Sequence, residues 1–232
     1  MDRSKYLKVG EEICKELVRL YPIRPAPKSH EGRTDATITE KDWISRIKNF
    51  TYAGEPVKLL KTEDDDRVWV DFAFLYSGEY FPVNFKSGIG RTADNISGLK
   101  YIRYLLFYDV DSEFNVQGIS EESIAKRITS LLRKEIRLDT HNRDYFCISH
   151  CSADNSVRII PVGSIAEEDL ATNPKNLFQV NFHTCRLVKR DLRQMVAFVI
   201  KKFIEYQKKR ADGYRIFTDA GFTENSKIEI ST

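Results

Sequence analysis

Two strand-like runs between residues 67 and 86 constrain the fold of this chain more than any other stretch. The first is VWVDFAF, residues 68–74, and the second is YFPVNFK, residues 80–86, with Tyr76-Ser77-Gly78-Glu79 between them. Apolar, aromatic-rich runs separated by a short glycine-containing turn predict a β-hairpin. Each run nevertheless carries polar side chains, Asp71 in the first and Asn84 and Lys86 in the second. A charged side chain in so apolar a run needs a partner or a function.

Length and composition indicate one domain, residues 1–232, with a real hydrophobic core. Hydrophobic residues make up 41% and charged residues 31%, which excludes a disordered chain. No apolar stretch approaches the ~18 residues of a membrane helix, so we expect no membrane association. The N-terminus lacks a signal-peptide pattern and the four cysteines lack disulfide spacing, which favours a cytoplasmic protein with reduced thiols. The net charge of +3 says little about partners.

Apolar periodicity predicts the remaining elements. Helices are expected over residues 3–20, 94–108, 120–137 and 189–210, with a short helix from a cap at Thr39 to Phe50. Strands are expected over residues 55–61, 144–150, 156–162 and 176–182. The proline-rich residues 22–36 predict a loop or extended arm, and residues 213–232 a weakly patterned tail. The expected class is α/β (or α+β), a central mixed β-sheet flanked by helices.

The polar residues of the hairpin predict a hard-cation site. Side chains at i and i+2 of a strand share a face, so Asn84 and Lys86 point the same way, and a paired first run brings Asp71 beside them. Asp71, the side-chain oxygen of Asn84 and the carbonyl of Phe85 are oxygen ligands suited to Mg²⁺. Lys86 would then stabilise charge on a phosphate and its attacking water. The alternative is a structural Asp–Lys pair. No dinucleotide or P-loop glycine motif is present.

The same residues carry a family resemblance. Val70-Asp71, a turn and Val83-Asn84-Phe85-Lys86 resemble the PD-(D/E)xK nuclease motif. Residues 82–87 with 92–95, and residues 178–182 followed by a long helix, are similar to type II restriction endonucleases of the EcoRV/HincII blunt-cutting group. The resemblance implies a restriction-endonuclease-like fold, a homodimer, and Mg²⁺-dependent cleavage of double-stranded DNA at a short palindromic site. It assigns catalysis to Asp71, Asn84 and Lys86.

The sequence departs from the family pattern at two positions. Val70 stands in place of the motif's proline, and Asn84 in place of its second acidic residue. An amide still offers an oxygen but lacks the charge, which predicts weaker metal binding, whether Asn84 is natural or an inactivating change. Glu11, Glu12 or Glu79 are candidates for a further carboxylate.

DNA contacts are predicted from side-chain type. Arginine suits guanine and asparagine or glutamine suit adenine, while lysine and arginine also contact phosphates. The predicted DNA-binding residues are Arg33, Lys100, Arg103, Asn142, Arg143, Gln179, Asn181 and His183.

The contact between the two copies of the expected homodimer is predicted on the first or the last helix.

The sequence also allows three other interpretations. The first is a non-catalytic nucleic-acid-binding module, and the second is a monomeric nuclease of repair type. A zinc site is the third, but the spacing of its potential ligands is not that of zinc knuckles, so these residues are interpreted as structural. The residues concerned are Cys147, His150, Cys151, His183 and Cys185.

Overall fold

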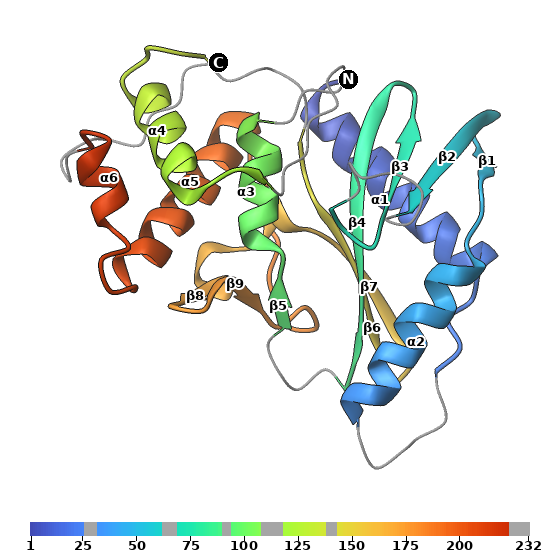
Figure 1. Ribbon diagram of the computed structural model, residues 1–232. Helices are drawn as coiled ribbons and strands as arrows, with labels where there is room; N and C mark the ends of the chain where they lie inside the picture. Colours follow the sequence, from blue (N-terminus) through green and yellow to red (C-terminus); the bar gives the residue numbers. More distant parts are fainter. Residues whose placement is uncertain (26–31, 62–68, 90–93, 108–117, 138–142, 223–232) are drawn as a thin grey trace.

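A computed structural model describes residues 1–25, 32–61, 69–89, 94–107, 118–137 and 143–222. Its main sheet has six strands in the order β1-β2-β3-β4-β6-β7 (Figure 1). Every neighbouring pair is antiparallel except β4–β6, which is parallel. The predicted mixed α/β class is therefore confirmed. The strands are β1 Phe50–Tyr52, β2 Glu55–Lys61, β3 Phe72–Tyr76, β4 Glu79–Gly88, β6 Phe146–Cys151 and β7 Ser156–Pro161.

Helices cover both faces of this sheet (Figure 1). On one face, α1 Arg3–Leu20 and α2 Gly32–Arg46 pack on aromatic side chains of β3 and β4. Gly10 permits the close approach of α1, because an added Cβ would lie 2.3 Å from Cζ of Phe146. The opposite face is covered by α3 Gly98–Phe107, α4 Glu121–Leu132 and α5 Leu192–Lys208, with α6 Arg215–Asp219 beyond them.

The predicted hairpin is confirmed and is formed by β3 and β4. Ser77 and Gly78 both have positive φ, as a two-residue hairpin turn of type I′ requires. The strands pair from Tyr76 opposite Glu79 to Phe72 opposite Val83. Among the described residues the pairing stops there, while β4 runs on to Gly88. The last five residues of β4 therefore have one edge with no strand described beside it.

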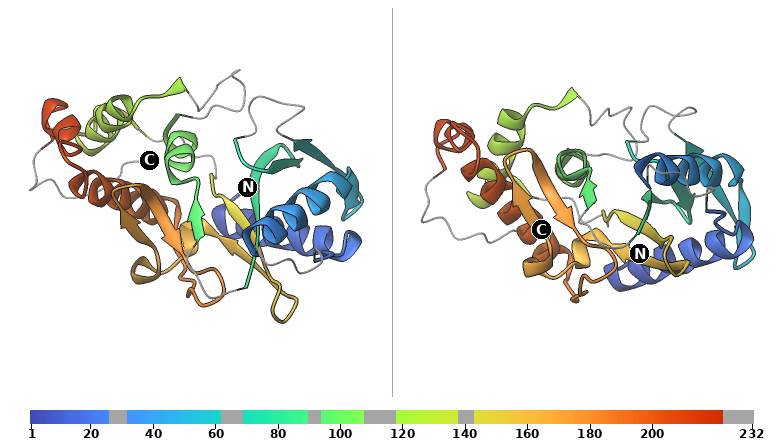
Figure 2. Two further views of the ribbon diagram at one scale, coloured as in Figure 1. Left: turned by 60° about the horizontal axis from the view of Figure 1, so that its bottom comes forward. Right: turned by 90° about the horizontal axis from the view of Figure 1, so that it is seen from below.

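A second, three-stranded sheet has the order β5-β9-β8. It consists of β5 Asp94–Ile96, β8 Ala171–Asn173 and β9 Asn176–Val180 and lies between α5 and the main sheet (Figure 2). Arg158 of β7 connects the main sheet to the segment that follows β9, because its guanidinium donates to the carbonyls of Phe182 and Cys185. Short 3-10 turns, Val162–Ser164 and Glu167–Asp169, lead from β7 to β8.

The structure corrects several predicted boundaries. The second helix runs from Gly32 to Arg46, so the loop predicted through residue 36 and the cap at Thr39 are wrong. Thr39 lies inside the helix because its hydroxyl donates to the carbonyl of Asp35, four residues earlier. Phe50 belongs to β1, where it pairs with Val57. The first residues of the helix predicted over 94–108 instead form β5, because β9 offers them a strand partner.

Other boundaries are closer to the prediction. The first helix has the predicted bounds, and the last is shorter by a few residues at each end. The helix predicted over 120–137 ends at Leu132, and residues 215–219 of the predicted tail form α6. No helix in the described ranges is long and apolar enough to cross a membrane.

Candidate functional site

The open edge of β4 is bonded by two carboxylates. The amide of Phe85 donates to Oδ2 of Asp71 at 2.7 Å, and the amide of Ser87 donates to Oε1 of Glu40 at 3.0 Å. Alternate residues of a strand direct their amides to the same edge, about 6.6 Å apart. Asp71 precedes β3 and Glu40 lies on α2, so two separate elements bring acidic groups to this edge. The carbonyl of Phe85 faces the same edge as its amide.

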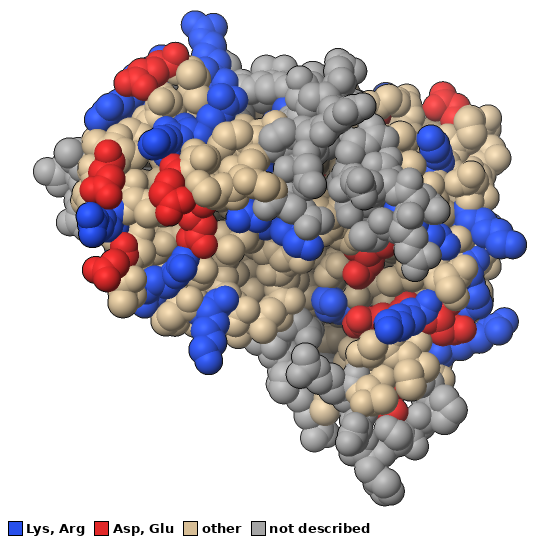
Figure 3. All heavy atoms as spheres, viewed as in Figure 1, with Lys and Arg blue, Asp and Glu red and all other residues tan. Residues whose placement is uncertain are grey.

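Lys86 lies between these two carboxylates along the strand. Its Nζ is 3.9 Å from Oε2 of Glu40, and the two side chains are 26% and 22% exposed. Lys86 also acts electrostatically on Asp71. Figure 3 shows acidic and basic side chains next to one another near the centre of the surface in view, in the region where Figure 1 has β4 passing α2. The arrangement is a partly accessible group of two carboxylates and one ammonium.

Asn84 is buried beside Asp71, and its hydrogen bonds define which end of its amide faces the carboxylate. The orientation that satisfies both ends has Nδ2 donating to Oδ2 of Asp71 at 2.7 Å and to Oδ1 at 3.1 Å. Its Oδ1 then accepts from the Tyr145 hydroxyl at 3.1 Å. In this orientation Asn84 holds Asp71 in place. The predicted ligand role of the Asn84 oxygen would require the amide to turn over.

The surroundings of Asp71 act on its ionisation in opposite directions. Burial raises the pKa of the Asp71 carboxyl above its usual value, whereas the charges of Lys86 and Lys100 and the Phe85 amide lower it. The two bonds from Asn84 Nδ2 also favour the ionised form. Lys100 projects from α3 and its Nζ donates to the carbonyl of Trp69 at 3.4 Å. An ionised Asp71 in this setting is stabilised by additional positive charge.

Glu40 is the residue of this site that the sequence did not reveal. It lies in a helix whose start the pattern misplaced, and no motif spacing links it to Asp71 or Lys86. The predicted alternatives are engaged elsewhere: Glu79 pairs with the N-terminal amine at 2.8 Å, Glu12 accepts from the Tyr52 hydroxyl, and Glu11 lines a surface pocket on α1. Only the packing of α2 on β4 could have indicated Glu40.

The predicted DNA contacts are scattered. Lys100 lies near Asp71, and His183 Nε2 is 3.3 Å from Oγ of Ser149, which is paired with Lys86 in β6. Arg143 is buried and donates to the carbonyl of Leu105, so it is not a surface contact in this conformation. Asn142 and the side chain of Arg33 lie outside the described residues. Asn181 caps the amide of His183, and Gln179 lies in the small sheet.

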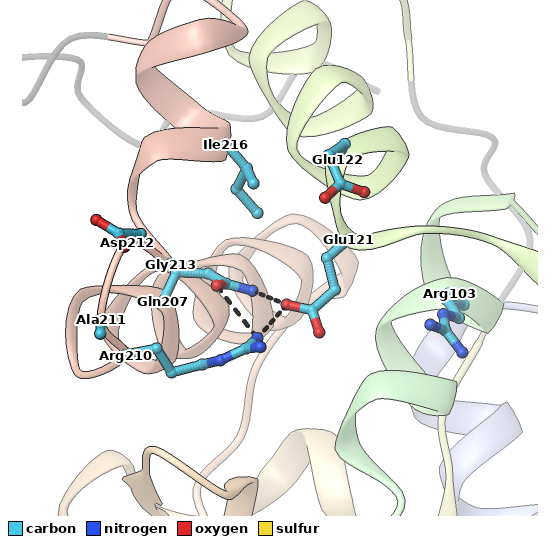
Figure 4. A pocket seen from close by; sticks show the side chains of 9 residues that line it. All are labelled: Arg103, Glu121, Glu122, Gln207, Arg210, Ala211, Asp212, Gly213 and Ile216. Atoms are coloured by element: carbon cyan, nitrogen blue, oxygen red, sulfur yellow. Dashed lines mark hydrogen bonds and ion pairs between the residues drawn. The ribbon is translucent and has the colours of Figure 1, made fainter.

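Arg103 faces a different region. It lines a pocket of about 410 Å³ between α3, α4 and α5 (Figure 4). The opposite wall carries Arg210 and Gln207, which both bond the Glu121 carboxylate. The structure thus places Arg103 at this pocket.

The zinc interpretation gains no support. In the described part of the chain, no group of three or more His, Cys, Asp or Glu side chains is arranged to hold a metal. His150 is instead held between Oγ of Ser87 and Oδ1 of Asn155, each at 2.9 Å. These bonds fasten the end of β4 to the β6–β7 turn. A site at the open edge of β4 would rest on two carboxylates, a backbone carbonyl and water.

That donor set fits Mg²⁺, which binds through one or two carboxylates and keeps several waters. Asp71 and Glu40 are the carboxylates that would hold it, with the Phe85 carbonyl on the same edge. Comparison with protein-family models, curated proteins and solved structures finds no match to this chain.

Proposed function

We propose that this protein is a Mg²⁺-dependent endonuclease that cleaves double-stranded DNA at a specific short site, in the manner of a type II restriction enzyme. The observation that carries the proposal is the group of Asp71, Glu40 and Lys86 on the open edge of β4. Two carboxylates able to hold a hard cation beside a lysine form a site suited to phosphodiester hydrolysis. The Lys86 and Glu40 side chains remain partly exposed, so part of the group is accessible.

Each residue has a distinct role in this proposal. Asp71, held by Asn84 and the Phe85 amide, offers its carboxylate in a fixed orientation. Lys86 places its ammonium where it stabilises the charge that develops on the phosphate and orients the attacking water. Glu40 holds Lys86 by an ion pair and supplies the second carboxylate. When bound, Mg²⁺ lowers the pKa of water and neutralises phosphate charge.

DNA and a second copy of this chain are the proposed partners. A palindromic site is matched by a two-fold symmetric dimer. The contact between the two copies is proposed on the charged outer side of α1 or of α5, because both helices bury their apolar side chains in the core. The rival interpretations are a monomeric repair-type nuclease and a binding module without catalysis.

Incubation with mixed-sequence plasmid and Mg²⁺ tests the proposal. We expect discrete fragments, and substitution of Lys86→Ala or Asp71→Ala to reduce the cleavage rate by about 100-fold or more, as loss of a transition-state contact does. Lys58→Ala is the matched control, because Lys58 is an exposed lysine of β2 in the same sheet. Its cleavage rate should equal that of the wild type.

The other outcomes are equally informative. A smear of fragments would favour the nonspecific repair-type nuclease, and an intact plasmid would favour the binding module. Cleavage that continues unchanged in both Asp71→Ala and Lys86→Ala would overturn the assignment of the site.

A further inference from the structure

A row of hydrogen-bonded amides crosses the outer face of the small sheet. Nδ2 of Asn173 on β8 donates to Oε1 of Gln179 on β9 at 2.5 Å. Nε2 of Gln179 donates in turn to Oδ1 of Asn95 on β5 at 2.8 Å. Asn95 is directly paired with Gln179 and is exposed, whereas its neighbour Ile96 is buried on the inner face. Asn173, Gln179 and Asn95 thus form a hydrogen-bonded amide row with one side chain from each strand of the small sheet.

The backbone fixes the orientation of every amide in the row. Oδ1 of Asn173 accepts from the amides of Lys175 and Asn176, both at 2.9 Å. A backbone N–H can only donate, so the oxygen of Asn173 must face this turn and its nitrogen must face Gln179. Gln179 must then present its oxygen to Asn173 and its nitrogen to Asn95. Asn95 is consequently held by its oxygen, which leaves its NH₂ group on the exposed end of the row.

The amide row is connected to the candidate site by the chain and by one side-chain contact. Asn95 lies nine positions after Lys86, and α3, which carries Lys100, begins three residues after Asn95. His183, three residues beyond β9, contacts Ser149, the β6 neighbour of Lys86. The segment after β9 is thus held against β6 beside Lys86. DNA bound at Lys86 would therefore have the small sheet next to it.

We propose that Asn95 reads an adenine in the major groove of the bound DNA, and that Gln179 and Asn173 position its amide; this inference rests on the proposed nuclease function. An asparagine amide donates to N7 of adenine and accepts from its N6 amino group, a pairing that other bases do not offer. The Asn95 oxygen retains a second lone pair after accepting from Gln179. Gln179, predicted from the sequence to contact DNA, acts here through Asn95.

The test compares sequence preference, not only rate. A duplex library with a randomised centre is cut in the presence of Mg²⁺, and the fragment ends are sequenced. For the wild type we expect an A·T pair among the specified positions. Asn95→Ala should lose about 5- to 150-fold of the preference at that pair alone, which corresponds to about 1–3 kcal/mol of discrimination. Gln179→Ala should relax the same position less. Replacing that adenine by 7-deazaadenine should reproduce the loss in the wild type.

Lys175→Ala is the matched control, because Lys175 is exposed in the β8–β9 turn and its side chain is not part of the amide row. It should leave the preference unchanged at every position. If the fragment ends of Asn95→Ala match those of the wild type, or the relaxed position is not an A·T pair, the inference is overturned while the nuclease proposal stands. Absence of any cutting by the wild type would overturn the proposed function itself.

Discussion

At the scale of single residues, the site depends on how Asp71 and Asn84 share their hydrogen bonds. The Asn84 amide nitrogen faces Asp71 and its oxygen faces Tyr145, so a residue predicted as a ligand acts in this arrangement as a support. Because the Asn84 amide is neutral, the negative charge of the Asp71–Asn84 pair belongs to the Asp71 carboxylate. Burial raises the pKa of that carboxyl, while the charges of Lys86 and Lys100 and the bonds from Phe85 and Asn84 favour its ionised form.

The pH dependence of stability follows from this shift. Because the pKa of Asp71 is higher in the folded than in the unfolded state, its contribution to stability is fully present at low pH. That contribution is lost as the pH rises through the folded pKa. In EDTA, the Tm of the wild type relative to that of Asp71→Asn should therefore fall as the pH is raised from about 3 to about 7. Thermal unfolding followed by circular dichroism measures the Tm of both proteins across this range.

Mg²⁺ provides the complementary measurement. It should raise the Tm of the wild type and leave that of Asp71→Asn unchanged, because binding to the folded state alone is stabilising. A Tm difference in EDTA that stays constant between about pH 3 and about pH 7 would show that the pKa of Asp71 is not raised in the folded state, contrary to our interpretation.

At the scale of elements, the packing of α2 against β4 completes the candidate site. Trp43 of α2 is fully buried and stacks on Phe85 with ring centroids 4.6 Å apart. Glu40 lies three residues earlier on the helix and so on the same side as Trp43. The aromatic contact thereby sets the position of a carboxylate at the strand edge, where Ser87 donates to it.

Two substitutions of Glu40 separate its charge from its hydrogen bond. Glu40→Gln keeps an oxygen for the Ser87 amide but removes the charge, so we expect an unchanged Tm and about 10-fold more Mg²⁺ needed for half-maximal cleavage. Glu40→Ala removes both, and should also lose about 1 kcal/mol of stability. Glu55→Gln, at an exposed position of β2, is the control for charge alone. Equal Mg²⁺ requirements for Glu40→Gln and the wild type would exclude Glu40 from the cation site.

At the scale of the whole molecule, Asp144 joins elements on both faces of the sheet. It is fully buried and pairs with Arg3 of α1 at 2.7 Å. It also accepts from the Tyr101 hydroxyl of α3 and from the Gly163 amide after β7. Gly163 is required there, because an added Cβ would lie 2.9 Å from the carboxylate and 2.5 Å from Met195. One carboxylate thus holds α1, α3 and the end of β7 together.

Removing this carboxylate should have a large effect on folding. Asp144→Ala leaves the buried Arg3 guanidinium without its charge partner, which typically costs about 3–5 kcal/mol. Asp42→Ala, which breaks the more exposed pair with Arg46, should change stability by less than about 1 kcal/mol. Urea denaturation of both variants measures the difference. Similar midpoints for the two would show that the Asp144 network is dispensable.

The sequence by itself determined the features that depend on neighbouring residues. The alternation of aromatic residues and the Ser77-Gly78 turn determined the β3–β4 hairpin, and the i, i+2 spacing placed Asn84 and Lys86 on one face. Apolar periodicity determined α1 to the residue and α5 to within three residues at each end. In each case the interactions that form the element lie within about a dozen residues of chain, so the pattern is visible without a partner.

Only the tertiary structure decided how these elements meet. Glu40 joins Lys86 across 46 positions, Asn95 pairs with Gln179 across 84, and Arg143 is buried under α3 although its type suggested a surface contact. Whether Asp94–Ile96 becomes strand or helix also depends on β9, which lies far away in the sequence. These contacts follow from which faces pack together, and the local pattern carries no information about that choice. The β3–β4 hairpin could therefore be predicted from the sequence. The positions of Glu40 and of the amide row could be found only in the tertiary structure.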